Sequence, residues 1–161
     1  MSFVDFLQHT YIGKILLTLA TSMLPVLELR AAIPFGVAAG LDPISAMVAA
    51  IIGNMLPVPF IILFVRSIFQ WLRSKSPRLE GLVAQLEARA EGKWDKVHRY
   101  ESLGLMILVA IPLPGTGAWT GALIASLVNL RMRRALPPLF AGVVIAGLLI
   151  TGITFGFAAI F

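Results

Sequence analysis

Two charged residues, Glu28 and Arg30, lie in the middle of an apolar stretch that runs from residue 15 to residue 41. Such a stretch is long enough to cross a bilayer, because a membrane-spanning helix needs about 20 apolar residues. A single straight helix would place both charges near the bilayer centre, at a cost of at least about 2.5–3.5 kcal/mol for each. So costly a placement predicts a functional site, with a purely structural pair of neutralising charges as the alternative.

The chemistry that this pair offers is proton exchange and anion binding. A carboxyl group in a partly dry cavity can bind and release a proton, which makes Glu28 a candidate proton carrier. The guanidinium of Arg30 keeps its charge, and its planar fork suits a phosphate or a carboxylate. We therefore expect Glu28 and Arg30 to form a site for protons and a small amphipathic substrate.

Breaks in the helix must position these two side chains. Pro25 and Pro34 flank them, and two prolines in so short a segment interrupt a helix twice. The sequence predicts that both charges lie on a non-helical tip inside the membrane. Backbone of that kind is tolerated only where protein buries it or where it lines a water-filled cavity.

A second break is predicted at residues 111–117, whose sequence is Ile-Pro-Leu-Pro-Gly-Thr-Gly. The helical arm that follows would expose its amides, which attract anions, and Thr116 would cap it. Gly115 and Gly117 permit close approach of a ligand to the backbone. Gly117 also forms a Gly-x-x-x-Gly pattern with Gly121, for which close helix packing is the alternative explanation.

Further candidates come from the spans and loops. Asn54 is a mid-span polar residue that could bond a carbonyl freed at a tip, in a structural or a functional role. The candidate substrate- and proton-binding residues are Glu28, Arg30, Asn54, Pro114, Gly115, Thr116, Gly117, Trp119 and Thr120. Arg131 and Arg134 are candidates for binding a lipid headgroup, and a plain cluster of cytoplasmic charge is the alternative.

Composition places these residues in an integral membrane protein. Of the 161 residues, 58% are hydrophobic and 13% are charged, whereas a soluble domain carries about 25% charged residues. Cysteine is absent, and no His, Asp or Glu spacing resembles a metal site. We expect one membrane domain over residues 1–161, no enzymatic activity and no cofactor. The net charge of +5 fits basic cytoplasmic loops better than nucleic-acid binding.

The apolar blocks predict an all-α fold with two re-entrant hairpins. The predicted elements are a hairpin over 15–41, a transmembrane helix over 44–65, an amphipathic interfacial helix over 76–101, a second hairpin over 103–128 and a transmembrane helix over 136–160. Each hairpin arm has about 12 residues, or roughly 18 Å of helix, a little over half of the hydrocarbon core. With both hairpins re-entrant, eleven of the 13 basic residues share one face, which the positive-inside bias puts in the cytoplasm. Two hairpin-plus-helix units of opposite topology then form an inverted repeat.

Three motifs carry a resemblance to a known family. They are Glu28-Leu29-Arg30-Ala31-Ala32-Ile33-Pro34-Phe35-Gly36, Gly53-Asn54-Met55-Leu56-Pro57, and the run from Ala110 to Ala122 that contains Pro-Leu-Pro-Gly-Thr-Gly-Ala-Trp-Thr-Gly. The chain resembles the putative small multi-drug export protein family from about residue 17 to residue 147. That family is similar in plan to the DedA/VTT membrane proteins, which have two opposed re-entrant loops and are implicated in lipid-carrier flipping and proton-linked phenotypes.

The resemblance implies where the site lies and how it differs from the DedA pattern. It assigns the site to Glu28 and Arg30 on the first hairpin and to residues 114–117 on the second. Phe35 and Gly36 stand where DedA sequences usually carry a second acidic residue. The resemblance therefore leaves Glu28 as the single membrane acid and argues against a two-carboxylate proton mechanism.

These observations predict a transporter in the inner (plasma) membrane of a prokaryote. The first hypothesis is proton-coupled translocation of an amphipathic anion such as a phosphorylated lipid. The alternatives are a proton/cationic-drug antiporter, in which Glu28 alone binds cation and proton in competition, and a non-transporting membrane assembly factor whose tips only pack. Membrane lipids are expected partners, and the small size of the chain favours a homodimer.

The predicted topology can be tested by labelling. The hairpin arrangement places Lys75 and Arg133 on the same, cytoplasmic, face of the membrane. Single cysteines at these positions, in a chain that has no cysteine of its own, should both resist an impermeant thiol reagent in intact cells. Labelling of only one of them would indicate four membrane crossings and would remove the inverted repeat.

Overall fold

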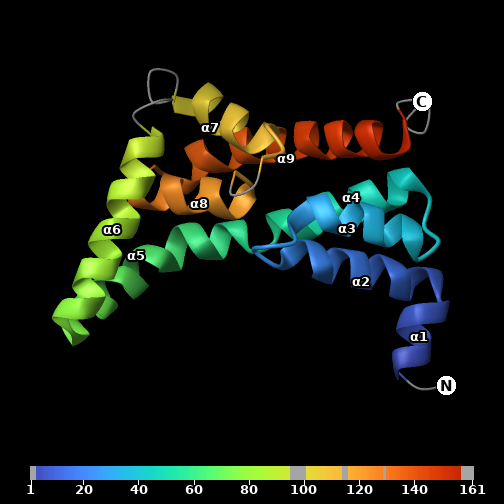
Figure 1. The fold of residues 1–161 in the computed structure, drawn as a ribbon, viewed down its shortest axis with the longest axis horizontal. Coiled ribbons are helices and arrows are strands. Elements are labelled where there is room, and N and C mark those ends of the chain that lie inside the picture. The colour runs from blue at the N-terminus through green and yellow to red at the C-terminus, as the bar shows by residue number, and fades with distance from the viewer. Residues whose placement is uncertain (1–2, 95–100, 114–115, 129, 157–161) are drawn as a thin grey trace.

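The computed structural model describes residues 3–94, 101–113, 116–128 and 130–156 of the chain. All regular structure in these residues is helical (Figure 1). The helices are α1 (Phe3–His9), α2 (Tyr11–Met23), α3 (Glu28–Ala38), α4 (Pro43–Met55), α5 (Val58–Lys75), α6 (Pro77–Trp94), α7 (Glu101–Ala110), α8 (Ala118–Leu127) and α9 (Met132–Phe155). The predicted all-α fold class is therefore confirmed.

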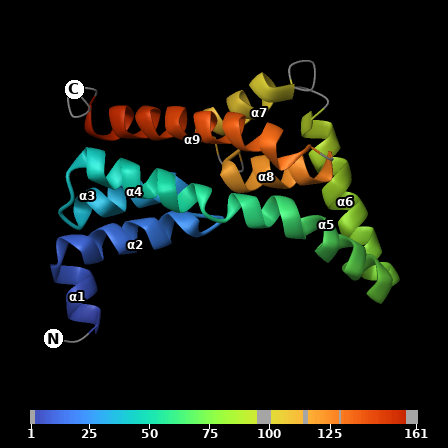
Figure 2. The same cartoon turned by 180° about the vertical axis from the view of Figure 1, so that it is seen from behind.

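Two helical hairpins meet near the middle of the molecule. In the first, α2 and α3 are joined by residues 24–27, called the first connection; in the second, α7 and α8 are joined by residues 111–117, called the second connection. Figures 1 and 2 show that the two hairpins enter from opposite ends of the molecule. Both breaks fall where prolines predicted them. How deep the hairpins lie in a membrane stays a prediction.

Two long apolar helical segments accompany the hairpins. Pro43–Lys75, which comprises α4 and α5, and Met132–Phe155, which is α9, are long and apolar enough to cross a membrane. They overlap the helices predicted over 44–65 and 136–160; residues 157–160 of the second prediction lie outside the described part of the chain. The first segment bends at Leu56 and Pro57, because Pro57 and Pro59 lack the amide that an unbroken helix would use. At about 1.5 Å per residue its 33 residues are longer than the roughly 30 Å hydrocarbon core.

Small residues let these helices pack closely. A side chain at Gly53 on α4 would collide with the backbone of Leu19 on α2. Beside it, the buried hydroxyl of Ser22 donates to the carbonyl oxygen of Ala50 at 2.6 Å. Close backbone approach through small residues is the usual way in which helices associate in membranes. It fixes the first hairpin against α4, which in turn packs against α9.

One expectation about the first hairpin is wrong. Arg30 does not lie on non-helical backbone, because α3 begins at Glu28 and continues through Pro34. Glu28, the first residue of α3, has a left-handed φ of 49°. Pro34 removes only the hydrogen bond to the carbonyl of Arg30. Helix α3 continues because its apolar residues pack against α2, α4 and α9, with Ala32 and Ile33 fully buried.

The polar segment after α5 forms a helix, α6, as predicted. Helix α6 begins at Pro77, with the Ser76 hydroxyl 3.3 Å from the amide of Arg78, as expected for a cap. It ends at Trp94, and residues 95–100 of the predicted 76–101 helix lie outside the described part of the chain. Val83 is buried, and α6 contacts α5 and α8, so the helix packs partly on protein.

The ends of the helices divide the molecule into two halves. The start of α1 and the end of α9 lie at one end in Figures 1 and 2, whereas the α5–α6 turn and the start of α9 lie in the opposite half. Arg73 on α5 forms an ion pair with Glu87 on α6 in that opposite half. The basic segments that were predicted to share a membrane face therefore lie in one half of the molecule.

Candidate functional site

Arg30 reaches from the first hairpin to the second connection. Its Nη1 donates to the carbonyl oxygen of Leu113, and its Nη2 donates to the hydroxyl of Thr116 at 3.2 Å. Leu113 lies beyond the end of α7, and its carbonyl oxygen also accepts from the backbone amide of Thr116 at 3.2 Å. The guanidinium of Arg30 adds a donor from the first hairpin.

Glu28 contacts the other side of the same connection. Its side chain is buried, and its carboxylate accepts a hydrogen bond from the backbone amide of Trp119 in the first turn of α8. The carboxylate also lies directly against Gly117, where any side chain would collide with it. Glycine is therefore required at position 117 by the close approach of Glu28.

Together the two charges complement the two broken helix ends. The cation lies at the carbonyl end of α7 and the anion lies at the amide end of α8, which is the favourable arrangement for both helix dipoles. We call the contacts among Glu28, Arg30, Leu113, Thr116 and the amide of Trp119 the tip contact. Glu28 and Arg30 form no ion pair with each other, but the positive charge of Arg30 acts on the carboxylate of Glu28, so the alternative of a neutralising pair stays a prediction.

The backbone of Glu28 is strained. Its φ angle of 49° makes it the one non-glycine residue with positive φ in the described chain. Its amide nevertheless donates to the carbonyl oxygen of Leu24 at 2.9 Å, across the first connection. A conformation of this kind costs about 1–3 kcal/mol and is commonly found at functional sites. The buried carboxylate and its partner on α8 hold the residue in this conformation.

Thr116 stabilises the second connection and does not cap α8. Its hydroxyl lies 2.8 Å from the carbonyl oxygens of Ile111 and Leu113 and accepts from the amide of Leu113 at 3.2 Å. The residue that precedes α8 is Gly117, which has no side chain to offer. The predicted cap is therefore wrong, and the carboxylate of Glu28 takes its place. Pro114 and Gly115 lie outside the described residues.

Trp119 connects the tip contact to an apolar groove. Its indole Nε1 donates at 3.0 Å to the carbonyl oxygen of Met23, the last residue of α2. The groove has a volume of about 400 Å³ and runs beside the bend between α4 and α5. Its lining is Met23, Leu56, Pro57, Phe60, Ile61, Phe64, Val65, Ile68 and Trp119. Thr120, the next residue of α8, is half-buried.

Asn54 does not bond a tip carbonyl, contrary to expectation. The residue is fully buried on α4, and neither atom of its amide has a hydrogen-bond partner. The carbonyl oxygens of Met23 and Leu113 accept from Trp119 and Arg30 instead. Thr151 on α9 is likewise buried with an unpartnered hydroxyl, and no sequence motif had singled it out.

The remaining predicted residues lie elsewhere. Arg131 and Arg134 are exposed at the start of α9, away from the tip contact. Sequence reasoning also missed partners within the site itself, namely the backbone groups of Met23, Ile111 and Leu113. A backbone carbonyl has no residue signature, and the prolines that free it were the only available signal.

A double-mutant cycle tests the contact between Glu28 and Gly117. Gly117→Ala should destabilise the fold by about 1–3 kcal/mol, because the added methyl group displaces the carboxylate. In a Glu28→Ala background the same change should cost less, with a coupling of about 0.5–3 kcal/mol. Denaturant unfolding in detergent measures both values. Gly81→Ala is the control, since position 81 has open space around it. Strict additivity between positions 28 and 117 would contradict the described contact.

The chain is similar to a known protein family. Residues 28–149 match the family described as putative small multi-drug export protein, and this segment contains Glu28, Arg30 and the whole second connection. No curated protein matches the chain, and no solved structure matches it. The match covers well over half of the 161 residues. The two long apolar helices and this match together indicate a membrane protein, and the chain belongs to the putative small multi-drug export protein family.

Proposed function

We propose that this protein is a membrane transporter that couples proton movement to translocation of an amphipathic anion, most plainly a phosphorylated lipid. Membership of an export family supports transport in general and leaves the substrate open. The observation that carries the finer proposal is the tip contact. One acid and one arginine join the two opposed hairpins there. A proton would compete for the carboxylate of Glu28, and a phosphate would compete for the guanidinium of Arg30.

The proposed coupling follows from what each ligand would do at the tip contact. Protonation of Glu28 removes the negative charge at the amide end of α8. A phosphate offers Arg30 charge-assisted, bidentate hydrogen bonds, which are stronger than those to the carbonyl of Leu113 and the hydroxyl of Thr116. Both events weaken the same contact between the hairpins, so each would favour the other.

The apolar groove beside Trp119 supports an amphipathic substrate. Trp119 lines the groove with its ring, and its backbone amide bonds Glu28. A molecule with its charged group at Arg30 would have apolar surface available for its tail within the same region. In this proposal the hairpins are re-entrant, form an inverted repeat and place the basic loops in the cytoplasm. The working unit would be a homodimer.

Two alternatives keep a specific observation in their favour. A proton/cationic-drug antiporter is favoured by the buried carboxylate of Glu28, although Arg30 beside it would repel a cation. A non-transporting assembly factor is favoured by the satisfied state of the tip contact, in which both charges already have protein partners. Substrate charge separates the first alternative from the main proposal, and loss of function without loss of fold excludes the second.

Reconstitution tests the proposal directly. Purified protein in liposomes that carry a pH gradient should move a phosphorylated lipid at a rate set by that gradient. Movement of a lipophilic cation alone would support the antiporter instead. Liposomes that move neither compound, with folded protein in them, would support the assembly factor.

The first variant test concerns Glu28. Glu28→Gln keeps the shape and removes the titration, so transport should lose its dependence on pH while expression and oligomeric state stay normal. The assay is the liposome flux measured across a series of pH values. Glu80→Gln, an exposed acid on α6, is the matched control and should behave as the parent. Unchanged pH dependence in Glu28→Gln would exclude this residue as the proton carrier.

The second variant test concerns Arg30 and the sign of the substrate. Arg30→Lys should weaken binding of a phosphorylated lipid about tenfold, because it keeps the charge and loses the fork. Arg30→Ala should weaken binding further and should improve binding of a lipophilic cation. Titration of both compounds against the parent and the two variants measures this, with Arg78→Ala on α6 as the control. If Arg30→Ala binds the phosphorylated lipid as well as the parent does, the anion proposal fails.

A further inference from the structure

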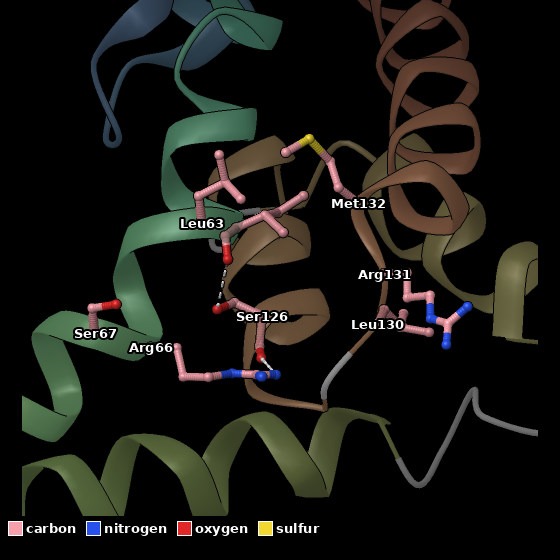
Figure 3. A pocket seen from close by; sticks show the side chains of 8 residues that line it. Leu63, Arg66, Ser67, Ser126, Leu130, Arg131 and Met132 are labelled. Carbon is pink, nitrogen blue, oxygen red and sulfur yellow. Dashed lines mark hydrogen bonds between the residues drawn. The ribbon is translucent and has the colours of Figure 1, made fainter.

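A polar cavity lies away from the tip contact and is distinct from the apolar groove. It has a volume of about 300 Å³ and lies between α5, the C-terminal part of α8 and the N-terminal end of α9 (Figure 3). Its lining is Ile62, Leu63, Arg66, Ser67, Ser126, Leu130, Arg131 and Met132. We call it the α5–α9 pocket. None of its residues takes part in the tip contact.

Arg66 is held in place at one side of this pocket. Its Nη2 donates to the carbonyl oxygen of Ser126 at 3.1 Å, and the buried hydroxyl of Ser126 in turn lies 3.3 Å from the carbonyl oxygen of Ile62. This pair of hydrogen bonds, drawn in Figure 3, joins α5 to α8. One bond to a neutral carbonyl uses one of the five donors of a guanidinium. The charge of Arg66 is therefore positioned but not neutralised.

Arg131 supplies a second charge from another element. Figure 3 shows it on the α9 side of the pocket, across from Arg66 on α5. In the described part of the chain the one ion pair joins Arg73 and Glu87, so neither pocket arginine has a carboxylate partner there. Arg66 and Arg131 line one cavity, which offers an anion two cationic side chains from different elements. Glu87, which pairs with Arg73, lines a neighbouring cavity that also includes Arg66.

The lining is apolar on one side and mostly polar on the other. Leu63 and Met132 lie on one side of the pocket in Figure 3, and Arg66 and Arg131 lie on the other, with Leu130 beside Arg131. The same change occurs along α5, which is apolar up to Val65 and rich in basic and polar residues from Arg66 onwards. A free phosphate would use only the polar side. A phospholipid would use both, with its phosphate near the arginines and its acyl chains beside Leu63.

We propose that the α5–α9 pocket binds the phosphate headgroup of an anionic membrane phospholipid. This lipid would bridge Arg66 and Arg131, and so would join helices from the two halves of the chain. It is a resident lipid and not the transported substrate, so the proposal does not depend on the proposed function. Attraction of basic residues near a membrane surface to anionic lipid supplies the long-range part of the affinity, and the pocket supplies the fixed geometry.

Lipid-dependent stabilisation tests this proposal. Purified protein in a neutral detergent is titrated with phosphatidylglycerol, with zwitterionic phosphatidylcholine and with inorganic phosphate, and the thermal midpoint is followed. A ligand that binds only the folded state raises that midpoint. Phosphatidylglycerol should raise it at the lowest concentration. Arg66→Gln and Arg131→Gln should each require about tenfold more of this lipid for the same shift.

The control and the contrary outcomes are defined by charge. Arg78→Gln removes the same charge from α6, outside the pocket lining, and should respond as the parent does. An equal loss in Arg78→Gln would show unspecific attraction, and an equal effect of inorganic phosphate would show a free-anion site; either result overturns the proposal. If Arg66→Gln does not fold, because it loses its bond to Ser126, Arg131→Gln decides the question alone. A parent-like response of Arg131→Gln would then refute the bridge.

Discussion

The fold depends on one requirement, which is that the backbone groups freed by two broken hairpins must find partners. Partners for these groups come from within the protein. The carbonyl oxygen of Met23 at the end of α2 receives the indole of Trp119, and that of Leu113 beyond α7 receives the guanidinium of Arg30. The amide of Trp119 at the start of α8 receives the carboxylate of Glu28. The carbonyl oxygen of Leu113 also accepts from the amide of Thr116 on its own hairpin, whereas the other two groups take their partners from the opposite hairpin.

Close packing makes this exchange of partners geometrically possible. Gly117 has no side chain, which lets the carboxylate of Glu28 reach the first turn of α8. Gly53 does the same for α2 against α4, where even a methyl group would meet the backbone of Leu19. The left-handed backbone of Glu28 is the strained element of the arrangement. It persists because the helices around it are fixed by these backbone contacts.

The sequence predicted the helix breaks and the charged site residues more successfully than their hydrogen-bond partners. Prolines at 25 and 112 located both connections, because a missing amide disturbs any helix. Pro34 misled the same reasoning, since tertiary packing carries α3 through it. Asn54 misled it too: the carbonyls of Met23 and Leu113 accept from Trp119 and Arg30, and which donor reaches a carbonyl depends on distances in three dimensions. The strain at Glu28 had no signal in the sequence at all.

The proposed transport and the observed tip contact place opposite demands on the same two side chains. As a fixed joint, the contact should be as strong as it can be made; as a switch, it must be close in free energy to an open state. The individual interactions in the tip contact are weak enough for a switch. Hydrogen bonds to neutral groups contribute about 0.5–1.5 kcal/mol each, and a charge at a helix end contributes about 0.3–1 kcal/mol when exposed, rising to about 2 kcal/mol when partly buried. A proton on Glu28 and a phosphate on Arg30 could offset contributions of this size, whereas a fully buried ion pair between Glu28 and Arg30 would resist both.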